Sequence, residues 1–240
     1  MPTNPIMNEN FNIIYEDENL LVVDKPAGIV VFPEDKEENK TLIDLILEKF
    51  PKIKEVGTPP RYGTAHRLDK DTSGLVLVAK NNPSMEFFQE QFKNGKVEKK
   101  YTALVAGIIK DNQGIIETLI GRSPNDRRKQ KAFGLNEESQ GKRRAETRFL
   151  VRKRFKGYTL MEISPKTGRK HQIRAHFAHI GHPLAGDKLY GFKNQPCPET
   201  LKRHFLHASF IKTFLLDGRV EEFRSELPEE LKTVINNLIE

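Results

Sequence analysis

The sequence predicts an α+β fold in which a mixed, largely antiparallel central sheet is flanked by helices. Short apolar runs separated by glycines recur along the chain, as is typical of strands joined by hairpins. Only a few segments show the 3.6-residue apolar period of a helix. Strand-like and helix-like segments do not alternate regularly, which argues against a parallel sheet built from strand–helix–strand units.

The N-terminal third is expected to contain strands, one helix and a long loop. Strands are expected at residues 12–16, 20–24 and 29–32. Residues 41–50 carry apolar side chains at helical spacing, with Thr41 available as the N-cap and Pro51 to end the helix. Residues 52–65 contain two glycines and two prolines, so they are expected to form a loop.

A buried strand, a helix and several antiparallel strands are expected in the middle of the chain. Residues 74–80 form a continuous apolar run, which predicts a buried strand. Asn82 and Pro83 suit a helix N-cap and first helical residue, and Gly95 lies just past the expected far end. An antiparallel meander is then expected at residues 97–107, 114–120, 144–151 and 157–163.

Two helices and two strands are expected in the C-terminal part. Residues 169–180 predict a helix with Ile173, Phe177 and Ile180 on one apolar stripe. Strands are expected around residues 206–214 and 219–224, and a last helix at residues 228–239.

The composition is typical of a globular protein of a reducing compartment. The 240 residues, 37% of them hydrophobic, suffice for one sizeable core or two small domains. No apolar run approaches the roughly 20 residues of a membrane span. Residues 1–10, expected to be flexible, lack the features of a signal peptide. Cys197 is the only cysteine, so we expect no disulfides and a cytoplasmic location. By default we also expect a monomer.

The positive charge is concentrated in one segment. The formal net charge is +7 and the pI is about 9.3. Residues 122–156 hold 13 Lys or Arg against 4 Asp or Glu, whereas the rest of the chain holds 27 against 29. A basic patch on a near-neutral body is typical of a protein that binds a polyanion such as nucleic acid. A solvated, charge-rich hairpin would give the same pattern, and charge alone leaves both interpretations open.

The segment 66–74 combines alternating charges with turn-forming residues directly before the buried strand. Its sequence is His-Arg-Leu-Asp-Lys-Asp-Thr-Ser-Gly. A carboxylate such as that of Asp69, on a loop that enters a rigid strand, is well placed for a catalytic site. An Asp in this setting also serves ordinary surface turns, so local chemistry leaves the assignment open.

A second charged segment, residues 166–176, leads from a turn into the expected helix. Arg169, Lys170 and Arg174 follow Gly168, and a helix start with arginine nearby can bind a phosphate or a carboxylate. Solvent-facing charges on an ordinary helix would look the same.

We expect neither a metal nor a cofactor. The sequence contains no Gly-x-Gly-x-x-Gly of a dinucleotide site, no Gly-x-Ser-x-Gly of a serine hydrolase and no His-Glu-x-x-His of a zinc protease. Four closely spaced histidines are interpreted as structural. They are His171, His176, His179 and His182.

Several stretches together resemble the RluA-type family of RNA pseudouridine synthases. The segment 66–74 resembles the active-site motif of that family. Further stretches resemble other family motifs, in the family order, at residues 21–28, 100–107, 167–174, 181–187, 190–191 and 206–208. The resemblance implies the pseudouridine synthase fold and isomerisation of uridine in ribosomal or transfer RNA.

The resemblance also implies roles for individual residues. Asp69 matches the catalytic carboxylate, Tyr101 the tyrosine that stacks on the target base, and Arg174 the arginine that pairs with the carboxylate. These three residues are distant in sequence and are expected to converge. Arg67 resembles an arginine that fills the place of a flipped base, and Leu206 is expected to pack under the base. RNA is the implied partner, with the basic segment holding its phosphates.

The sequence departs from the family pattern in a few places. Phe32 stands where many relatives have His, and Tyr62 where Pro is common. Because only about ten residues precede the first expected strand, the N-terminal S4 RNA-binding domain of many relatives is not expected here. Residues 11–240 are expected to form a single catalytic domain.

Two other functions remain open at this point. A catalytically silent RNA-binding module would use the basic segment without needing Asp69, Tyr101 and Arg174. A hydrolase of nucleosides or glycosidic bonds generally uses two placed carboxylates. Asp71 is the one close second candidate for such a pair, and we interpret it as a turn residue.

Overall fold

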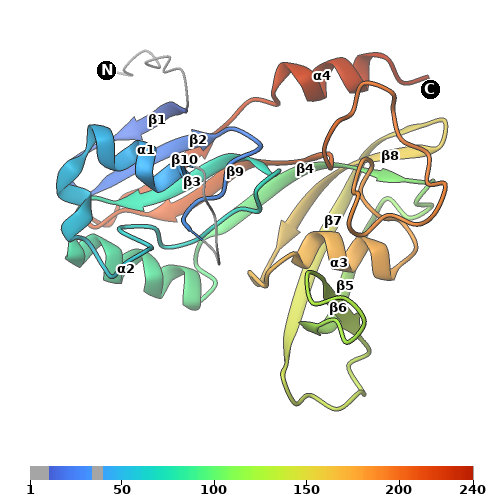
Figure 1. Ribbon diagram of the computed structural model, residues 1–240, viewed down its shortest axis with the longest axis horizontal. Coiled ribbons are helices and arrows are strands. Elements are labelled where there is room, and N and C mark those ends of the chain that lie inside the picture. The colour runs from blue at the N-terminus through green and yellow to red at the C-terminus, as the bar shows by residue number, and fades with distance from the viewer. Residues whose placement is uncertain (1–10, 34–39, 240) are drawn as a thin grey trace. The chain divides into compact units, whose positions relative to one another are not determined.

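The computed structural model describes residues 11–33 and 40–239 (Figure 1). The prediction of a flexible segment at residues 1–10 lies outside the described residues. In chain order the elements are β1 (Asn12–Glu16), β2 (Leu20–Lys25), α1 (Leu42–Lys49), η1 (Pro51–Glu55), β3 (Ser73–Ala79), α2 (Asn82–Lys93), β4 (Glu98–Ala106), β5 (Gln113–Arg122), β6 (Gln130–Phe133), β7 (Lys142–Phe155), β8 (Tyr158–Pro165), α3 (Gln172–His179), β9 (Leu206–Phe214), β10 (Val220–Arg224) and α4 (Glu229–Asn236).

The chain divides into two compact units. The first consists of Met1–Lys99 with Ala208–Glu226, and the second of Lys100–His207 with Leu227–Glu240. Every strand pair with a described register is antiparallel. The prediction of an α+β fold with a largely antiparallel sheet and flanking helices is therefore confirmed. No helix among the described residues is long and apolar enough to cross a membrane.

The first unit is built on strands in the order β1-β2-β3-β9, with β10 pairing β9. Strand β2 pairs with β3 along its whole length, from Leu20 opposite Ala79 to Lys25 opposite Gly74. Every residue of β3 is buried, as its continuous apolar run predicts. Helix α2 packs on β3, and Phe88 of α2 joins the apolar core of this unit.

Two predictions near α1 have different outcomes. The predicted cap at Thr41 is confirmed, because Thr41 Oγ1 accepts from the Asp44 backbone and the Asp44 carboxylate accepts from the Thr41 N–H at 2.9 Å. The strand expected at residues 29–32 is wrong. The carbonyl groups of Val30 and Val31 instead accept from the first two amides of α1, both at 2.9 Å, so this segment closes the start of the helix.

The cap of α2 lies one residue earlier than predicted. Asn81 is the N-cap, and its Oδ1 accepts from the Ser84 N–H at 2.9 Å. Asn82 serves another contact, because its Oδ1 accepts from the Gly57 N–H at 2.8 Å. Within the expected loop, the 3-10 helix η1 follows directly after α1, with a proline as its first residue.

The second unit has the strand order β4-β8-β7-β5-β6. Strand β4 pairs with β8 and not with β5, so the expected simple meander is wrong at this step. The 14-residue strand β7 pairs with both β5 and β8. The short strand β6 was not expected from the sequence. Helix α3 packs against β5, β6 and β7, and α4 contributes Leu231 and Val234 to a separate apolar cluster.

Helix α3 begins three residues later than predicted. His171 precedes it with a left-handed backbone, φ 55°. The Gln172 Oε1 accepts from the Arg169 N–H at 3.0 Å and from Thr167 Oγ1 at 2.7 Å, which fixes the turn before the helix. Two residues of the predicted apolar stripe, Ile173 and Phe177, are buried. The third, Ile180, is 38% exposed.

Candidate active site

Asp69 lies in the loop that enters β3 in the first unit. Its side chain is partly exposed, between the buried Leu68 and the exposed Lys70. The Asp69 carbonyl accepts from the Thr72 N–H at 3.1 Å, and the Lys70 carbonyl accepts from the Gly28 N–H at 2.9 Å. The backbone on the C-terminal side of Asp69 is therefore fixed by hydrogen bonds, while the carboxylate stays partly accessible.

The side chain of Lys25 stabilises this loop through hydrogen bonds. Its side chain is completely buried, and its Nζ donates to three carbonyl oxygens: Pro26 at 2.8 Å, Ile29 at 2.9 Å and Lys70 at 3.0 Å. An ammonium group has three donors, so these carbonyls match its capacity. The sequence pattern gave Lys25 no role, although the residue lies in a stretch that resembles a family motif.

A glycine at the start of β3 allows the close approach of β9. Gly74 has φ +117°, and a Cβ at this position would overlap the backbone of Ala208. Only glycine tolerates both the backbone angle and the contact. The turn that ends the Asp69 loop therefore packs tightly against the neighbouring strand.

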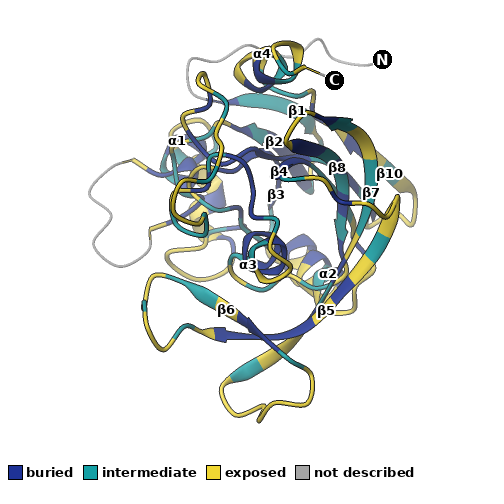
Figure 2. Ribbon diagram, turned by 90° about the vertical axis from the view of Figure 1, so that its right-hand side faces the viewer, coloured by how far each residue is buried: buried dark blue, intermediate teal, exposed yellow. Residues whose placement is uncertain are grey.

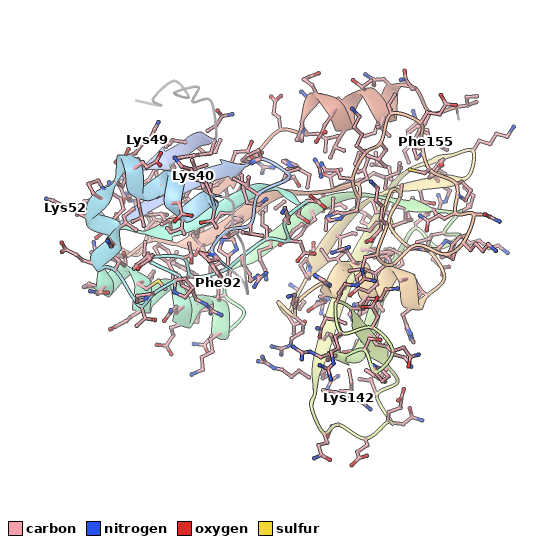
Figure 3. All side chains as sticks on the ribbon, viewed as in Figure 1. Lys40, Lys49, Lys52, Phe92, Lys142 and Phe155 are labelled. Carbon is pink, nitrogen blue, oxygen red and sulfur yellow. The ribbon has the colours of Figure 1, made fainter. Side chains whose placement is uncertain are left out.

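His66 fixes the other end of the loop. Its Nε2 accepts a hydrogen bond from the Leu77 N–H at 2.9 Å. Its ring stacks on Phe92, with ring centroids 4.6 Å apart; Phe92 is labelled in Figure 3. Burial, with a smaller contribution from the charge of Lys99, lowers the pKa of His66 to about 3. His66 is therefore neutral at physiological pH, as its acceptor role requires.

Arg67 lies on an aromatic platform beside Asp69. The guanidinium carbons of Arg67 and Arg61 lie 5.2 and 5.1 Å from the centroid of the Phe32 ring, within the range of cation–π interactions. Burial lowers the pKa of Arg67, and the negative charge of Asp69 opposes this effect. Phe32, which departs from the family pattern, thus lies within cation–π distance of both arginines.

In the second unit, the structure brings Tyr101 and Leu206 together. Tyr101 lies on β4 and is partly buried, and Leu206 is the buried first residue of β9. Both belong to an apolar cluster that also contains Ile173 of α3. Apolar side chains of this cluster therefore pack against Tyr101.

Arg174 forms a buried, two-pronged ion pair with Asp187 in the same unit. Its Nε lies 2.7 Å from Asp187 Oδ2 and its Nη2 lies 2.9 Å from Oδ1. Asp187 Oδ1 also accepts from the backbone amides of Leu189 and Tyr190, both at 3.0 Å. Burial raises the pKa of Asp187, but the hydrogen bonds and charge of Arg174 outweigh it and the net pKa is lowered. The predicted pairing of Arg174 with Asp69 stays a prediction.

The contact of Asp187 with Arg174 is one that the sequence pattern did not indicate. Asp187 closes the motif at residues 181–187, but nothing in the local pattern indicates which cation it binds. Its contacts fix the orientation of the Arg174 guanidinium before any substrate is present.

The basic segment, residues 122–156, includes the edge strand β6 and the exposed loop from β6 to β7 (Figure 2). Strand β6 pairs with β5, and the hairpin that these two strands form is called the basic hairpin below. Lys142, labelled in Figure 3, is the first residue of β7, directly after the loop from β6. Three acidic residues of the basic segment form ion pairs within it: Arg128–Asp126 at 2.8 Å, Lys142–Glu137 at 3.7 Å and Arg148–Glu146 at 2.8 Å. The remaining basic side chains give this surface its excess positive charge. Those that are exposed include Arg122, Arg127, Lys131 and Arg143.

Three of the four histidines near α3 make hydrogen bonds within the second unit. His176 Nε2 lies 2.9 Å from Thr118 Oγ1, and His182 Nδ1 lies 2.8 Å from the Ala106 carbonyl oxygen. His171 Nδ1 lies 3.0 Å from the hydroxyl oxygen of Tyr190. Within residues 11–33 and 40–239, no three His, Cys, Asp or Glu side chains are grouped so as to hold a metal ion.

Comparisons with known proteins agree on one family. The model of the RNA pseudouridylate synthase family matches residues 19–179, a range that contains Asp69, Tyr101 and Arg174. The chain is 39% identical over 241 residues to an RNA pseudouridine synthase of Aquifex aeolicus described as uncharacterized, covering 97% of this chain and 74% of that protein. It is 36% identical to the ribosomal large subunit pseudouridine synthase D of Nitrosomonas europaea, covering 93% of this chain and 64% of that protein.

A solved structure supports the same assignment. The human RNA pseudouridylate synthase domain containing 1 protein has a TM-score of 0.74 and 27% identity, covering 97% of this chain and 90% of the human one. Sequence and structure comparisons extend over almost the whole chain and include the loop of Asp69, so the chain belongs to the RNA pseudouridylate synthase family and is an RNA pseudouridine synthase of the RluA type.

Proposed function

We propose that this enzyme isomerises specific uridines of structured RNA with Asp69 as its catalytic carboxylate. The observation that carries the proposal is the Asp69 loop itself. The loop resembles the family active-site motif, and its backbone is fixed by Lys25, Gly28 and Thr72 while Asp69 as a residue is partly exposed. A fixed yet accessible carboxylate is what a catalytic group requires.

The proposed reaction rearranges one nucleotide without any net redox change. The N1–C1′ bond breaks, the uracil turns, C5 bonds to C1′, the C5 proton leaves to solvent and N1 takes up a proton. No group donor or electron carrier is consumed, so we propose that no cofactor takes part. Asp69 acts on C1′, either as the nucleophile or by stabilising the positive charge that develops there.

The charge of Arg67 supports an ionised Asp69, because the two side chains attract each other. Arg174 is proposed to add to this stabilisation during the reaction, with its guanidinium oriented in advance by Asp187. The neighbouring charges then favour the carboxylate form that both versions of the mechanism need.

Tyr101 and Leu206 are proposed to bind the target base. Their shared apolar cluster supports a role in stacking on one face of the uracil and packing against it. Tyr101 is also proposed to help remove the C5 proton. That role requires a lowered pKa in the complex with RNA, because an ordinary tyrosine is protonated at neutral pH.

The target base must leave its stack to reach the loop, and Arg67 is proposed to occupy the vacated place. Its planar guanidinium, held on the Phe32 ring, has the shape of a base and can stack in the same way. We propose ribosomal or transfer RNA as the substrate. Ribosomal RNA gains support from the relatives that are named ribosomal large subunit pseudouridine synthase D. We further propose that the chain acts as a monomer.

The test is incubation of the protein with ribosomal and transfer RNA that carry tritium at C5 of uridine. Isomerisation releases tritium to water and leaves pseudouridine in the intact RNA. A silent RNA-binding module would bind the RNA and release nothing, whereas a hydrolase would release free uracil. Either of these two results would contradict the proposed function.

A further inference from the structure

Tyr190 connects three parts of the second unit through its side chain. Its hydroxyl oxygen accepts from the Gln130 N–H of β6 at 2.7 Å and lies 3.0 Å from His171 Nδ1. The rings of Tyr190 and His171 meet edge to face, with an interplanar angle of 88°. The guanidinium carbon of Arg174 lies 4.9 Å from the centroid of the Tyr190 ring. One side chain therefore contacts the basic hairpin, the residue before α3 and the arginine of α3.

The backbone of Tyr190 contacts the same arginine indirectly. Its N–H donates to Asp187 Oδ1, the oxygen that also accepts from Arg174 Nη2. The Arg174 guanidinium thus has the Asp187 carboxylate along one edge and the Tyr190 ring on one face. A stacked and two-pronged arginine has little rotational freedom, so a shift of Tyr190 must shift Arg174.

The hairpin side of this connection carries the charges expected to meet RNA. Gln130 lies between Lys129 and Lys131, and it pairs with Arg122 across β5 and β6. The Lys129 ammonium lies 6.0 Å from the centroid of the Tyr190 ring. The Gln130 N–H, which donates to the Tyr190 hydroxyl oxygen, therefore lies within the basic surface.

We propose that Tyr190 is a positioning residue that couples the binding of RNA phosphates on the basic hairpin to the orientation of Arg174. The inference rests on the proposed function, since it assigns RNA to the hairpin and a catalytic role to Arg174. RNA that binds Lys129 and Lys131 orders β6, the Gln130 amide holds the Tyr190 hydroxyl, and the Tyr190 ring holds the guanidinium. Asp187 already holds one edge of the Arg174 guanidinium, and RNA on the hairpin restrains its face through Tyr190. Specificity follows, because only RNA that also occupies the hairpin adds this second restraint.

Two substitutions separate the contacts. Tyr190→Phe keeps the ring on Arg174 and the amide on Asp187, and removes the hydroxyl contacts to Gln130 and His171. Tyr190→Leu removes the ring as well. Tyr158→Phe is the matched control, because Tyr158 is a buried tyrosine of β8 in the same unit.

Hydrogen exchange and NMR test the coupling without any turnover. In Tyr190→Phe, exchange of the Gln130 amide should be about three- to tenfold faster, as expected when one hydrogen bond is removed. The shift of the Arg174 Nε–H resonance on addition of RNA should be smaller in Tyr190→Phe than in the unchanged protein and in Tyr158→Phe. Unchanged Gln130 exchange, or an RNA-induced Arg174 shift that is undiminished in Tyr190→Phe, overturns the inference.

Kinetics of tritium release provide the second readout. Tyr190→Phe should raise KM for RNA by about three- to tenfold with kcat nearly unchanged, and Tyr190→Leu should also lower kcat by about tenfold. A merely structural role would reduce the amount of active enzyme, so kcat would fall at constant KM in both variants, and that result overturns the inference. If the unchanged protein releases no tritium, the proposed function fails, and the exchange and NMR results still decide the coupling.

Discussion

The ammonium nitrogen of Lys25 lies 3.0 Å from the carbonyl oxygen of Lys70, the residue directly after Asp69. Lys25 is completely buried and donates to two further carbonyl groups, so its charge serves to fix the backbone. The two residues are far apart in sequence, and this bond joins the end of β2 to the loop before β3. The position of the Asp69 carboxylate therefore depends on a residue that does not itself need to meet the substrate.

Lys25→Met should destabilise the protein by about 3 kcal/mol, because three carbonyl groups lose a charged donor in a buried place. Urea denaturation measures the change, and activity per folded molecule should fall as well, since the Asp69 loop loses an anchor. Lys52→Met, at an exposed position of η1, is the control and should change stability little. A Lys25→Met protein as stable and as active as the control would show that the loop is held by other contacts.

Asp187→Asn should cost about 3 to 5 kcal/mol, because it leaves the buried Arg174 without its counter-charge. The exposed pair of Asp217 and Arg219 is the matched control, and Asp217→Asn should change the free energy of unfolding little. Urea denaturation of both variants at pH 7 makes the comparison. Equal losses would contradict the importance assigned to the buried pair.

The same pair predicts a pH dependence at the acid end. The net pKa of Asp187 is lowered in the folded protein, so its stabilising contribution is present above the unfolded pKa of about 4. That contribution is lost as the pH falls through the folded-state pKa. The unfolding free energies of the unchanged protein and of Asp187→Asn should therefore approach each other below pH 4, and a constant difference would be inconsistent with an ionised Asp187.

His66 predicts a second pH dependence, in the neutral to acid range. Its folded-state pKa of about 3 lies below the ordinary 6.5, so the unfolded chain binds a proton that the folded protein does not. Stability should fall as the pH drops below 6.5, by up to about 1.4 kcal/mol per pH unit from this group. His176, with a pKa lowered to about 4 by burial, adds a similar loss.

His66→Gln should remove the part of this loss that belongs to His66. Denaturation midpoints of the variant should vary less between pH 6.5 and 5 than those of the unchanged protein. His179→Gln, at an exposed position, should keep the original dependence. If both variants behave like the unchanged protein, His66 does not remain neutral in the folded state.

The basic hairpin should govern the salt dependence of RNA binding. We consider a variant in which four side chains of the hairpin are neutralised: Arg127, Arg128, Lys129 and Lys131. This variant should bind RNA more weakly. The slope of log K against log salt should become shallower by about 0.7 to 0.9 for each RNA phosphate that the hairpin no longer binds. The control variant has four cations of the first unit neutralised: Lys49, Lys52, Lys54 and Lys93. Its salt dependence of RNA binding should stay steeper than that of the hairpin variant. Filter binding at several salt concentrations makes the measurement, and equal slopes would show that the hairpin does not face RNA.

Most strands could be predicted because each is a local apolar run, and β3, buried along its whole length, is the clearest case. Strand β6 could not, since its sequence Gln-Lys-Ala-Phe is short and half polar, and it exists through pairing with β5. Residues 29–32 are apolar enough for a strand, but their carbonyl groups are taken by the start of α1. Pairing partners that are distant in the chain decide such segments.

The candidate site also has a part that the sequence could indicate and a part that it could not. Asp69, Tyr101 and Arg174 could be picked out because each lies in a stretch that resembles a family motif. The contacts of Lys25 with Lys70 and of Arg174 with Asp187 arise only when the chain folds, so no local period or spacing indicates them. Tyr190 is similar: its hydroxyl contacts Gln130, 60 residues away in the chain.

The central claim is that the carboxylate of Asp69 performs the isomerisation, and Asp69→Asn tests it most directly. This change keeps the size of the side chain and the backbone bond from Thr72 to the Asp69 carbonyl, and it removes only the charge. Asp71→Asn, two residues on in the same loop, is the matched control. Both variants are assayed for tritium release from C5-labelled uridine in RNA, with RNA affinity measured in parallel. We predict that Asp69→Asn binds RNA as the unchanged protein does and releases no tritium, while Asp71→Asn stays active; undiminished release by Asp69→Asn would contradict the assignment.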